Sequence, residues 1–237
     1  MKTILITGIT SELIAPFIEF LLTKDGIRII GTFNKTIPLI HNQRIELCKV
    51  DMNSDEDVNN FIGSLKERQV DYFLQGHGNC FSQSHFETIK IEDVKRDIDV
   101  NLISTIRILQ AIIIKMKKSG FGRILLISTA SANHGGGITT FAYGLSKSGI
   151  EYTVKALAKE YTKYNILTNA IAPGFFKTNF HLLRAGKTKQ DFEERAKFVR
   201  LGRAGEPQEL VPVINTLLLD NSFISGEIIK VDGADFI

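Results

Sequence analysis

The sequence predicts an α/β protein, in which helices cover both faces of a doubly wound, mostly parallel sheet. Three observations predict this fold class. Short β-branched runs alternate with longer segments of helical period, as in repeated strand–helix units. Seven such runs occur at a spacing that suits one sheet. The length of 237 residues fits one domain spanning residues 1–237, and no linker or internal repeat divides it.

The strands are expected where the β-branched and apolar residues cluster. The first is the run Ile4-Leu5-Ile6, which ends at Thr7-Gly8, where a strand would pass into a phosphate-binding turn. In chain order the seven expected strands are residues 2–6, 28–33, 45–50, 72–75, 123–128, 167–171 and 227–231.

Helices are expected between the strands. The stretch NSDEDVNNFIGSLKERQ, residues 53–69, begins with a capping residue, Asn53 or Ser54, and carries acids in its first turn. A longer helix is predicted over 91–118, where apolar residues recur every three or four positions and Gly120 marks the end. Two more are expected over 142–164 and 207–219. The charged segment 179–201 is interpreted either as a solvated surface helix or as a lid over the substrate.

Composition excludes several classes of protein. The net charge of +3 comes from 29 basic and 26 acidic residues, which is too even a balance for a nucleic-acid-binding protein. Cys48 and Cys80 have no metal-binding spacing and are too few for a disulfide framework, which favours a reducing compartment. No apolar run approaches the ~20 residues of a membrane span, so a cytoplasmic protein without a membrane partner is expected.

The strongest motif is AYGLSK, which places Tyr143 and Lys147 four residues apart at the start of a helix. This spacing puts both side chains on one helical face, about 6 Å apart along the axis. A lysine ammonium near a phenol favours the phenolate and so prepares the tyrosine for proton transfer. A surface pair of this kind has no function, so its surroundings decide the interpretation.

Two neighbouring strands end in residues that suit the same pocket. The run GRILLISTAS closes with the hydroxyl residues Ser128, Thr129 and Ser131, and NAIAPGFFKT closes with Pro173-Gly174. Ligands bind at the carboxyl ends of strands in a parallel sheet, so one hydroxyl is expected to face the pocket of Tyr143.

Taken together, these motifs resemble the short-chain dehydrogenase/reductase family, whose fold is a single-domain Rossmann fold. The likeness covers nearly the whole chain, through LGRAGEPQEL at 201–210 to the closing SGEIIKVDGA at 225–234. These last segments are similar to those of 3-oxoacyl-[acyl-carrier-protein] reductases.

The resemblance implies four catalytic residues. Tyr143 would protonate the substrate carbonyl oxygen, and Lys147 would hold the nicotinamide ribose and keep the tyrosine acidic. Asn101, in the sequence DVNL, matches the family asparagine that supports a proton-relay water. The family's substrate-orienting serine falls on Thr129, and Ser128 and Ser131 are the alternatives.

Two cofactor motifs depart from the family pattern. In Thr-Gly-x-x-x-Gly-x-Gly, Glu12 and Ile14 replace the later glycines. We expect Ile14 to push the following helix outward and Glu12 to turn toward solvent, so that pyrophosphate contacts are altered or weaker. The family's Asn-Asn-Ala-Gly is here Gln75-Gly76-His77-Gly78, and His77 is expected to narrow the wall of the nucleotide site.

The end of the second strand, IIGTFNK, contains no acid to hold a ribose 2′-hydroxyl, which favours NADP over NAD. No metal site is expected. The resemblance assigns cofactor binding to Gly8, Thr10, Ser11, Glu12, Leu13, Asn34, Lys35, Asp51, Met52, Gly76, Gly78, Tyr143, Lys147, Pro173, Gly174 and Thr178.

The function predicted from the sequence is hydride transfer between NADP and a carbonyl or secondary alcohol. The resemblance indicates a 3-oxoacyl thioester, carried on acyl carrier protein or coenzyme A, and a homotetramer built through the two long helices. The alternative is a relative that keeps the fold but serves as a binding or scaffold protein, because a fold alone does not establish activity. A hydrolase is disfavoured, since Ser148 takes the last glycine position of the Gly-x-Ser-x-Gly motif.

Overall fold

A computed structural model describes residues 1–180 and 188–235. Within them, seven strands form one sheet in the order β3-β2-β1-β4-β5-β6-β7, and every neighbouring pair is parallel. The α/β fold class is thereby confirmed, and the seven expected strands are all present to within one or two residues at each end. Their bounds are β1 Lys2–Thr7, β2 Ile27–Phe33, β3 Ile45–Lys49, β4 Tyr72–Gln75, β5 Gly122–Ile127, β6 Ile166–Pro173 and β7 Ile228–Val231.

The chain winds outward from β1 to β3 and then returns to place β4 on the other side of β1. The order of the strands therefore reverses between β1 and β4, and this switch point lies at the carboxyl ends of both strands. In doubly wound sheets this is where ligands bind. Gly8 follows β1, and the segment Gly76-His77-Gly78 follows β4, so both altered cofactor motifs lie at this switch point.

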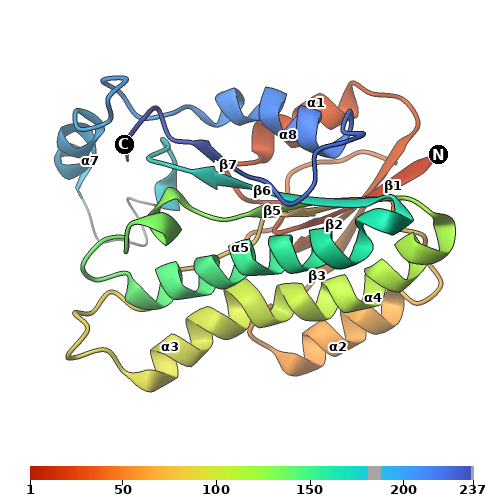
Figure 1. Ribbon diagram of the computed structural model, residues 1–237, viewed down its shortest axis with the longest axis horizontal. Coiled ribbons are helices and arrows are strands. Elements are labelled where there is room, and N and C mark those ends of the chain that lie inside the picture. Colours follow the sequence, from red (N-terminus) through yellow and green to blue (C-terminus); the bar gives the residue numbers. More distant parts are fainter. Residues whose placement is uncertain (181–187, 236–237) are drawn as a thin grey trace.

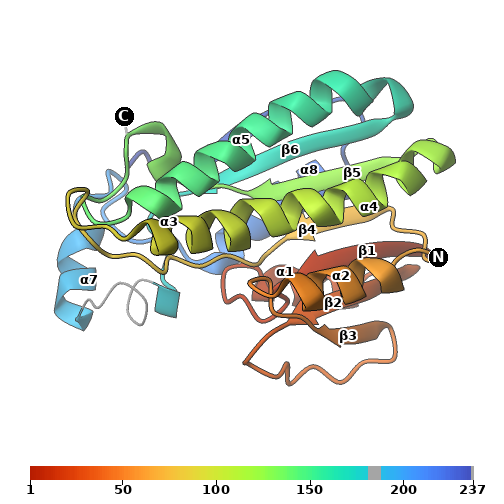
Figure 2. The same ribbon diagram turned by 90° about the horizontal axis from the view of Figure 1, so that it is seen from below.

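Helices form a layer on each face of the sheet (Figure 1). On one face α1 and α8 lie side by side, and on the other α2, α4 and α5 lie along the strands (Figure 2), with α3 leading into α4. The helix bounds are α1 Ala15–Leu22, α2 Asp55–Ser64, α3 Ile91–Ile98, α4 Ser104–Ser119, α5 Phe141–Tyr161, α7 Lys189–Ala196 and α8 Val211–Leu218.

The helix expected over 91–118 is interrupted. A π-helical turn, Asp99–Ile103, separates α3 from α4. The three-and-four spacing of apolar residues continues through the turn, so the sequence pattern carries no sign of it. Turns of this type add one residue to the helical ring and often occur at functional sites. Asn101 lies inside this turn.

Several helix ends agree with the sequence signals. Ser54, one of the two candidate caps, accepts a hydrogen bond from the Asp57 N–H at 3.2 Å. Gly120 closes α4 in the left-handed conformation, with φ of 66°. The helix expected over 207–219 begins with a 3₁₀ turn, Pro207–Leu210, before α8.

A close contact between Ile14 and Gly76 explains how the chain accommodates the first altered motif. Ile14, at the start of α1, is fully buried in the core between the sheet, α1 and α8. A Cβ atom added to Gly76 would lie 2.4 Å from Ile14 Cδ1 and 2.7 Å from the Thr7 carbonyl oxygen. Ile14 therefore occupies space left by the missing side chain at position 76. The expectation that Ile14 pushes α1 outward did not consider that Gly76 leaves room for the Ile14 side chain.

The Ile14–Gly76 packing leads to a stability prediction. Ile14→Ala should lower the free energy of unfolding by about 2–5 kcal/mol, because it leaves a cavity in the core. Gly76→Ala should also destabilise, because its new Cβ meets Ile14. In the double variant Ile14→Ala/Gly76→Ala the cost should be smaller than the sum of the two, since truncation of Ile14 relieves part of the clash.

Urea denaturation of the wild type and the three variants measures these costs. Ile138→Ala, at a side chain that is 80% exposed, is the matched control and should change stability by less than about 0.5 kcal/mol. Strictly additive costs would show that the two positions do not share the space.

Candidate active site

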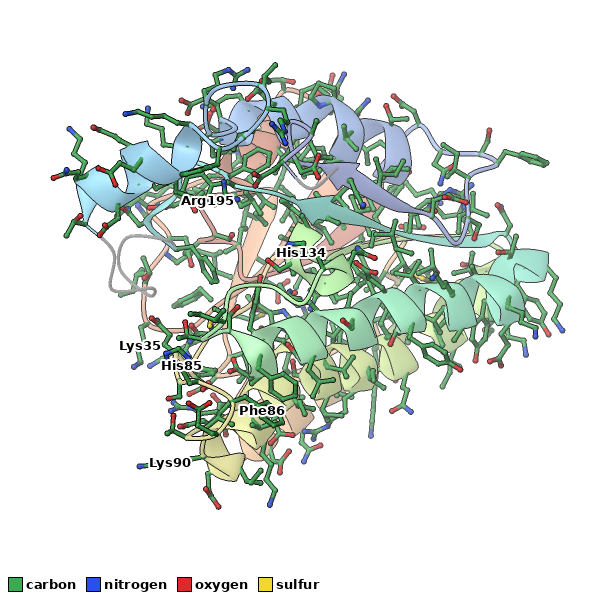
Figure 3. All side chains as sticks on the ribbon, turned by 60° about the vertical axis from the view of Figure 1, so that its left-hand side comes forward. Lys35, His85, Phe86, Lys90, His134 and Arg195 are labelled. Atoms are coloured by element: carbon green, nitrogen blue, oxygen red, sulfur yellow. The ribbon has the colours of Figure 1, made fainter. Side chains whose placement is uncertain are left out.

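The sequence-predicted site residues gather at the carboxyl ends of the strands. Figure 3 views this end of the molecule, where Lys35, His85 and His134 come from the segments that follow β2, β4 and β5. Tyr143, Lys147 and Asn101 approach the same end from α5 and from the π-helical turn.

The first turn of α5 carries the candidate proton donor. Tyr143 is half-buried, and one turn later Lys147 is almost fully buried. The Lys147 Nζ lies 5.8 Å from the centroid of the Tyr143 ring and donates a hydrogen bond of 2.7 Å to the Ile127 carbonyl at the end of β5. Burial lowers the pKa of Lys147 to about 8. Near neutral pH the amine is still mainly protonated, so it places a positive charge beside the phenol.

Asn101 is fully buried and grips the loop after β4. Its Oδ1 accepts a hydrogen bond from the Asn79 N–H, and its Nδ2 donates one to the Asn79 carbonyl, both at 2.8 Å. The reciprocal pair fixes the backbone at Asn79 and, through it, the neighbouring Gly78. The side-chain amide of Asn101 is thus used structurally, a role that the sequence motif did not indicate.

Gly78 lies between Lys147 of α5 and Asn101 of the π-helical turn. A Cβ added there would stand 3.3 Å from Asn101 Oδ1 and 3.4 Å from Lys147 Nζ. A side chain at this position would be tight against the Asn101 amide oxygen. The structure therefore brings Lys147 and Asn101 together at Gly78, and Lys147 lies beside the Tyr143 ring.

His77 points into the protein rather than narrowing the nucleotide wall, which corrects the expectation from sequence. Its Nε2 lies 3.1 Å from both the Val100 carbonyl and Ser104 Oγ, and its Nδ1 lies 2.6 Å from Thr7 Oγ1. A carbonyl only accepts, so Nε2 carries the proton and Nδ1 accepts from the Thr7 hydroxyl. Burial, and to a lesser degree the Lys147 charge, lower the pKa of His77 to about 3. A neutral histidine thus ties the end of β1 to the π-helical turn.

Gln75 continues this polar network, which sequence reasoning missed. Its Nε2 donates to the Asn101 carbonyl at 3.0 Å and to Thr105 Oγ1 at 2.7 Å, and its Oε1 accepts from the Ile127 N–H at 3.4 Å. The longer side chain, where the family has asparagine, lets one amide reach both the helix and β5. The signal in the sequence that could have indicated this network was the replacement of the family's asparagine by Gln75.

The three candidate hydroxyls after β5 have different environments. Ser128 is buried and donates to Glu151 Oε1 at 2.7 Å, so it is directed toward α5. Thr129 is half-buried and its Oγ1 accepts from the Ser131 N–H at 3.3 Å, which leaves the hydroxyl hydrogen available for donation. Ser131 is also half-buried, beside Gly136. This geometry favours Thr129, with Ser131 second, over Ser128.

The loop after β1 retains a tight turn despite its altered motif. Gly8 has φ of 66°, and a Cβ there would lie 2.6 Å from the His77 backbone. The Gly8 N–H donates to Thr32 Oγ1 at 3.1 Å, and its carbonyl accepts from the Ser11 N–H at 2.9 Å. Thr32, which lies in the segment IIGTFNK at the end of β2, thus supports this turn. The neighbouring assigned residues Thr10, Ser11 and Leu13 are half-buried.

Glu12 is exposed but not free. Its Oε2 accepts a hydrogen bond of 2.6 Å from the Asn179 N–H, and its Oε1 accepts one from Asn179 Nδ2. The next residue, Phe180, packs against Tyr143 with ring centroids 5.7 Å apart and an interplanar angle of 43°. We expect Glu12 to face solvent when the cofactor binds; its side chain is exposed here, and Asn179 supplies two donors to its carboxylate.

The remaining assigned residues surround this centre. Asn34 is half-buried and Lys35 exposed after β2, while Asp51 and Met52 follow β3, where Asp51 Oδ1 accepts from the Asn53 N–H at 2.9 Å. At the end of β6, a Cβ on Gly174 would lie 2.6 Å from Asp232 Cβ, so close packing against β7 requires this glycine. Pro173 is buried and Thr178 is half-buried.

The expected lid, residues 179–201, is only partly accessible to description, since 181–187 lie outside the described residues. Its helix α7 is anchored, because Phe192 packs on Phe175 with ring centroids 4.5 Å apart and Arg195 pairs with Asp235. In the described ranges no helix is long and apolar enough to span a membrane. The same ranges contain no group of three His, Cys, Asp or Glu side chains placed to hold a metal ion.

Comparisons with known proteins agree with this geometry. A family model described as enoyl-(acyl carrier protein) reductase matches residues 30–233. The 3-oxoacyl-[acyl-carrier-protein] reductase FabG of Aquifex aeolicus is 28% identical over 99% of this chain and 88% of its own. Carbonyl reductase family member 4 of Xenopus tropicalis is 32% identical over 75% of this chain and 70% of its own. A short-chain dehydrogenase from Leptospira borgpetersenii, solved with bound NAD+, has a TM-score of 0.87 at 23% identity, covering 100% and 93% of the two chains.

The low pKa of His77 predicts a pH-dependent stability. Between about pH 6.5 and 3 the folded protein holds this imidazole neutral while the unfolded chain protonates it, so unfolding takes up a proton. The contribution of His77 to stability is therefore present above pH 6.5 and is lost as the pH falls. The stability gap between wild type and His77→Gln should narrow by ~2 kcal/mol from pH 7 to pH 5.

Urea denaturation at the two pH values measures this gap. His85→Gln, at an exposed histidine in the loop after β4, is the matched control and should follow the wild type at both. A gap that is equal at pH 7 and pH 5 would show that His77 gains no proton on unfolding.

Proposed function

The chain belongs to the short-chain dehydrogenase/reductase family, whose members transfer hydride between a nicotinamide cofactor and a CH–OH or C=O group, and we propose that it is an NADP-dependent carbonyl reductase. The observation that carries this proposal is the arrangement of three side chains: Lys147 lies beside the Tyr143 ring, and Lys147 and Asn101 both border Gly78. These three residues come from two separate elements and meet only in the folded protein. A scaffold protein has no need to keep them in register.

The local backbone fits a nicotinamide dinucleotide. The tight turn at Gly8 precedes a helix N-terminus, which suits an anion. Gly78 lies beside the Lys147 ammonium, where the ribose would approach. The main chain from Gly8 to Leu13, but not the Glu12 carboxylate, would hold the phosphates together with Thr178. Asp51 and Met52 would hold the adenine, and Lys147 the nicotinamide ribose. When bound, the cofactor supplies or accepts the hydride.

In the proposed mechanism, Tyr143 supplies the proton that the substrate carbonyl oxygen requires in the direction of reduction. The Lys147 ammonium favours the phenolate that remains, and its hydrogen bond to Ile127 holds it in place. Thr129 donates its hydroxyl hydrogen to the carbonyl oxygen and so orients it, with Ser131 as the alternative. Asn101 fixes the loop that carries Gly78. In the proposed mechanism Asn101 also supports a proton-relay water.

NADP is favoured by the residues after β2. Asn34 is half-buried and Lys35 exposed, and neither bears a negative charge that would repel a 2′-phosphate. Lys35 is also the cation nearest in sequence to the strand end. Thr32, also in the segment IIGTFNK, accepts a hydrogen bond from the Gly8 N–H. The choice between NADP and NAD therefore depends on Asn34 and Lys35.

The proposed substrate is a 3-oxoacyl thioester, carried on acyl carrier protein or coenzyme A. The relative from Aquifex aeolicus is named as a reductase of such thioesters, and the relative from Xenopus tropicalis as a carbonyl reductase. Phe180 beside Tyr143 offers an apolar surface that suits an acyl chain.

A homotetramer in the cytoplasm completes the proposal. The long helices α4 and α5 expose large apolar side chains, among them Ile114 at 69% and Tyr152 at 75%, which an interface between copies would cover. Both cysteines are free thiols, in keeping with a reducing compartment.

The decisive experiment combines binding and turnover. Isothermal titration of the purified protein with NADPH and NADH tests cofactor binding, and absorbance at the nicotinamide band follows oxidation of NADPH with a panel of 3-oxoacyl thioesters and simple ketones. Binding of NADPH with turnover of a thioester supports the proposal. A protein that binds neither nucleotide would instead be a scaffold that keeps the fold.

Tyr143→Phe should lower kcat by ~10²–10⁴-fold, because it removes the hydroxyl that transfers the proton. The affinity for NADPH should stay within about threefold of the wild type, since Lys147 and the glycine loops are unchanged. Tyr152→Phe, on the exposed face of the same helix, is the matched control and should keep full activity. A Tyr143→Phe enzyme with normal kcat would remove this residue from the mechanism.

Asn34→Asp should shift the preference from NADPH to NADH by about 10-fold or more in kcat/KM, because a carboxylate repels a 2′-phosphate and accepts from a 2′-hydroxyl. Steady-state kinetics with both nucleotides measure the ratio. Asn133→Asp, at an exposed residue after β5, is the control for an added negative charge. An unchanged ratio would place the selection of the 2′-group elsewhere.

A further inference from the structure

Glu12 links two loops that lie far apart in the sequence. It follows the tight turn at Gly8, where the family pattern has a glycine, and its carboxylate accepts hydrogen bonds from the main chain and the side chain of Asn179. The two residues are 167 positions apart. We call this pair of hydrogen bonds the Glu12–Asn179 clasp. It joins the loop after β1 to the segment after β6, across the carboxyl end of the sheet.

The clasp engages donors of the kind that bind phosphate. The main-chain N–H of Asn179 follows Thr178, which the proposed function assigns to the cofactor, and the side-chain amide offers further N–H groups. Carboxylate and phosphate oxygens compete for such donors because both are anionic acceptors. While Glu12 holds Asn179, these donors are not available to another anion, and the carboxylate adds a negative charge next to the phosphate loop.

The clasp also reaches the catalytic tyrosine. Phe180 is the residue next to Asn179, and its ring packs 5.7 Å from that of Tyr143. A segment tied at Asn179 holds the following ring in position, whereas a released segment would leave it free to move. The two neighbouring residues thus face different sites, one at the phosphate loop and the other at the proton donor.

We propose that Glu12 is an internal competitor for the cofactor pyrophosphate, and that release of Asn179 from Glu12 couples cofactor binding to the position of Phe180 over Tyr143. This inference rests on the proposed nicotinamide function. Glu12 leaves Asn179 before the amide groups serve a phosphate, so the wild type binds its cofactor more weakly than a chain without the carboxylate. The weaker cofactor binding comes from the hydrogen-bonded pair of Glu12 and Asn179 and not from the negative charge of Glu12 alone.

The first test uses the cofactor-free protein. Hydrogen exchange followed by mass spectrometry on peptides covering residues 174–180 should show a protected amide in the wild type and faster exchange in Glu12→Ala. Glu19→Ala, which removes an exposed carboxylate from α1, is the matched control and should exchange as the wild type does. Equal protection in wild type and Glu12→Ala would overturn the clasp.

The second test is a double-mutant cycle read by isothermal titration with NADPH. Glu12→Ala should bind NADPH ~10-fold more tightly than the wild type. In the Asn179→Ala background the same change should give a clearly smaller gain, because the clasp is already weakened. The KM for NADPH should fall in Glu12→Ala.

The outcomes separate this inference from the proposed function. An equal gain in both backgrounds would mean that Glu12 acts by charge repulsion alone, and an unchanged dissociation constant in Glu12→Ala would mean that it does not compete. Either result overturns the competition but leaves a nucleotide-binding enzyme. Absence of NADPH and NADH binding in every variant overturns both.

Discussion

The hydrogen-bond network around the π-helical turn holds the site together. His77 ties the turn to the end of β1, and Gln75 ties it to the end of β5. Asn101, inside the turn, fixes the loop at Asn79. Buried polar groups must find partners, so each of these bonds is costly to lose. The positions of Gly78 and Lys147 relative to one another follow from this network, because it fixes the loop that carries Gly78 and the end of β5 to which Lys147 donates its hydrogen bond.

The same network shows how a changed motif still forms an ordered loop. The family's Asn-Asn-Ala-Gly is replaced here by Gln75-Gly76-His77-Gly78. The longer amide of Gln75 spans from helix to strand, and the imidazole of His77 fills the interior and bonds at both nitrogens. Three of the four positions differ in chemistry from the family or in the space they leave, yet the loop still presents its last glycine beside the catalytic groups.

Sequence patterns predicted the strands and several helix ends, because strand and helix periods and capping residues are local signals. The residues of the candidate centre were predicted from the family resemblance of the motifs that contain them. The sequence patterns did not predict the π-helical turn, since the apolar spacing runs through it unchanged. They also missed Ser128 bonding to Glu151 and Glu12 bonding to Asn179, whose partners are distant in sequence. The expectation for the direction of the His77 side chain was wrong for the same reason, because that direction depends on contacts with Val100 and Ser104, which are distant in sequence.

The contact between Ile14 and Gly76 constrains the order in which this sequence could have diverged from the family pattern. An isoleucine at position 14 and a side chain at position 76 compete for the same volume. A lineage that acquired Ile14 first would have carried a clash, whereas one that first lost the side chain at 76 would have carried only a small void. The route without a clash therefore passes through glycine at both positions, so the two replacements are not independent of one another.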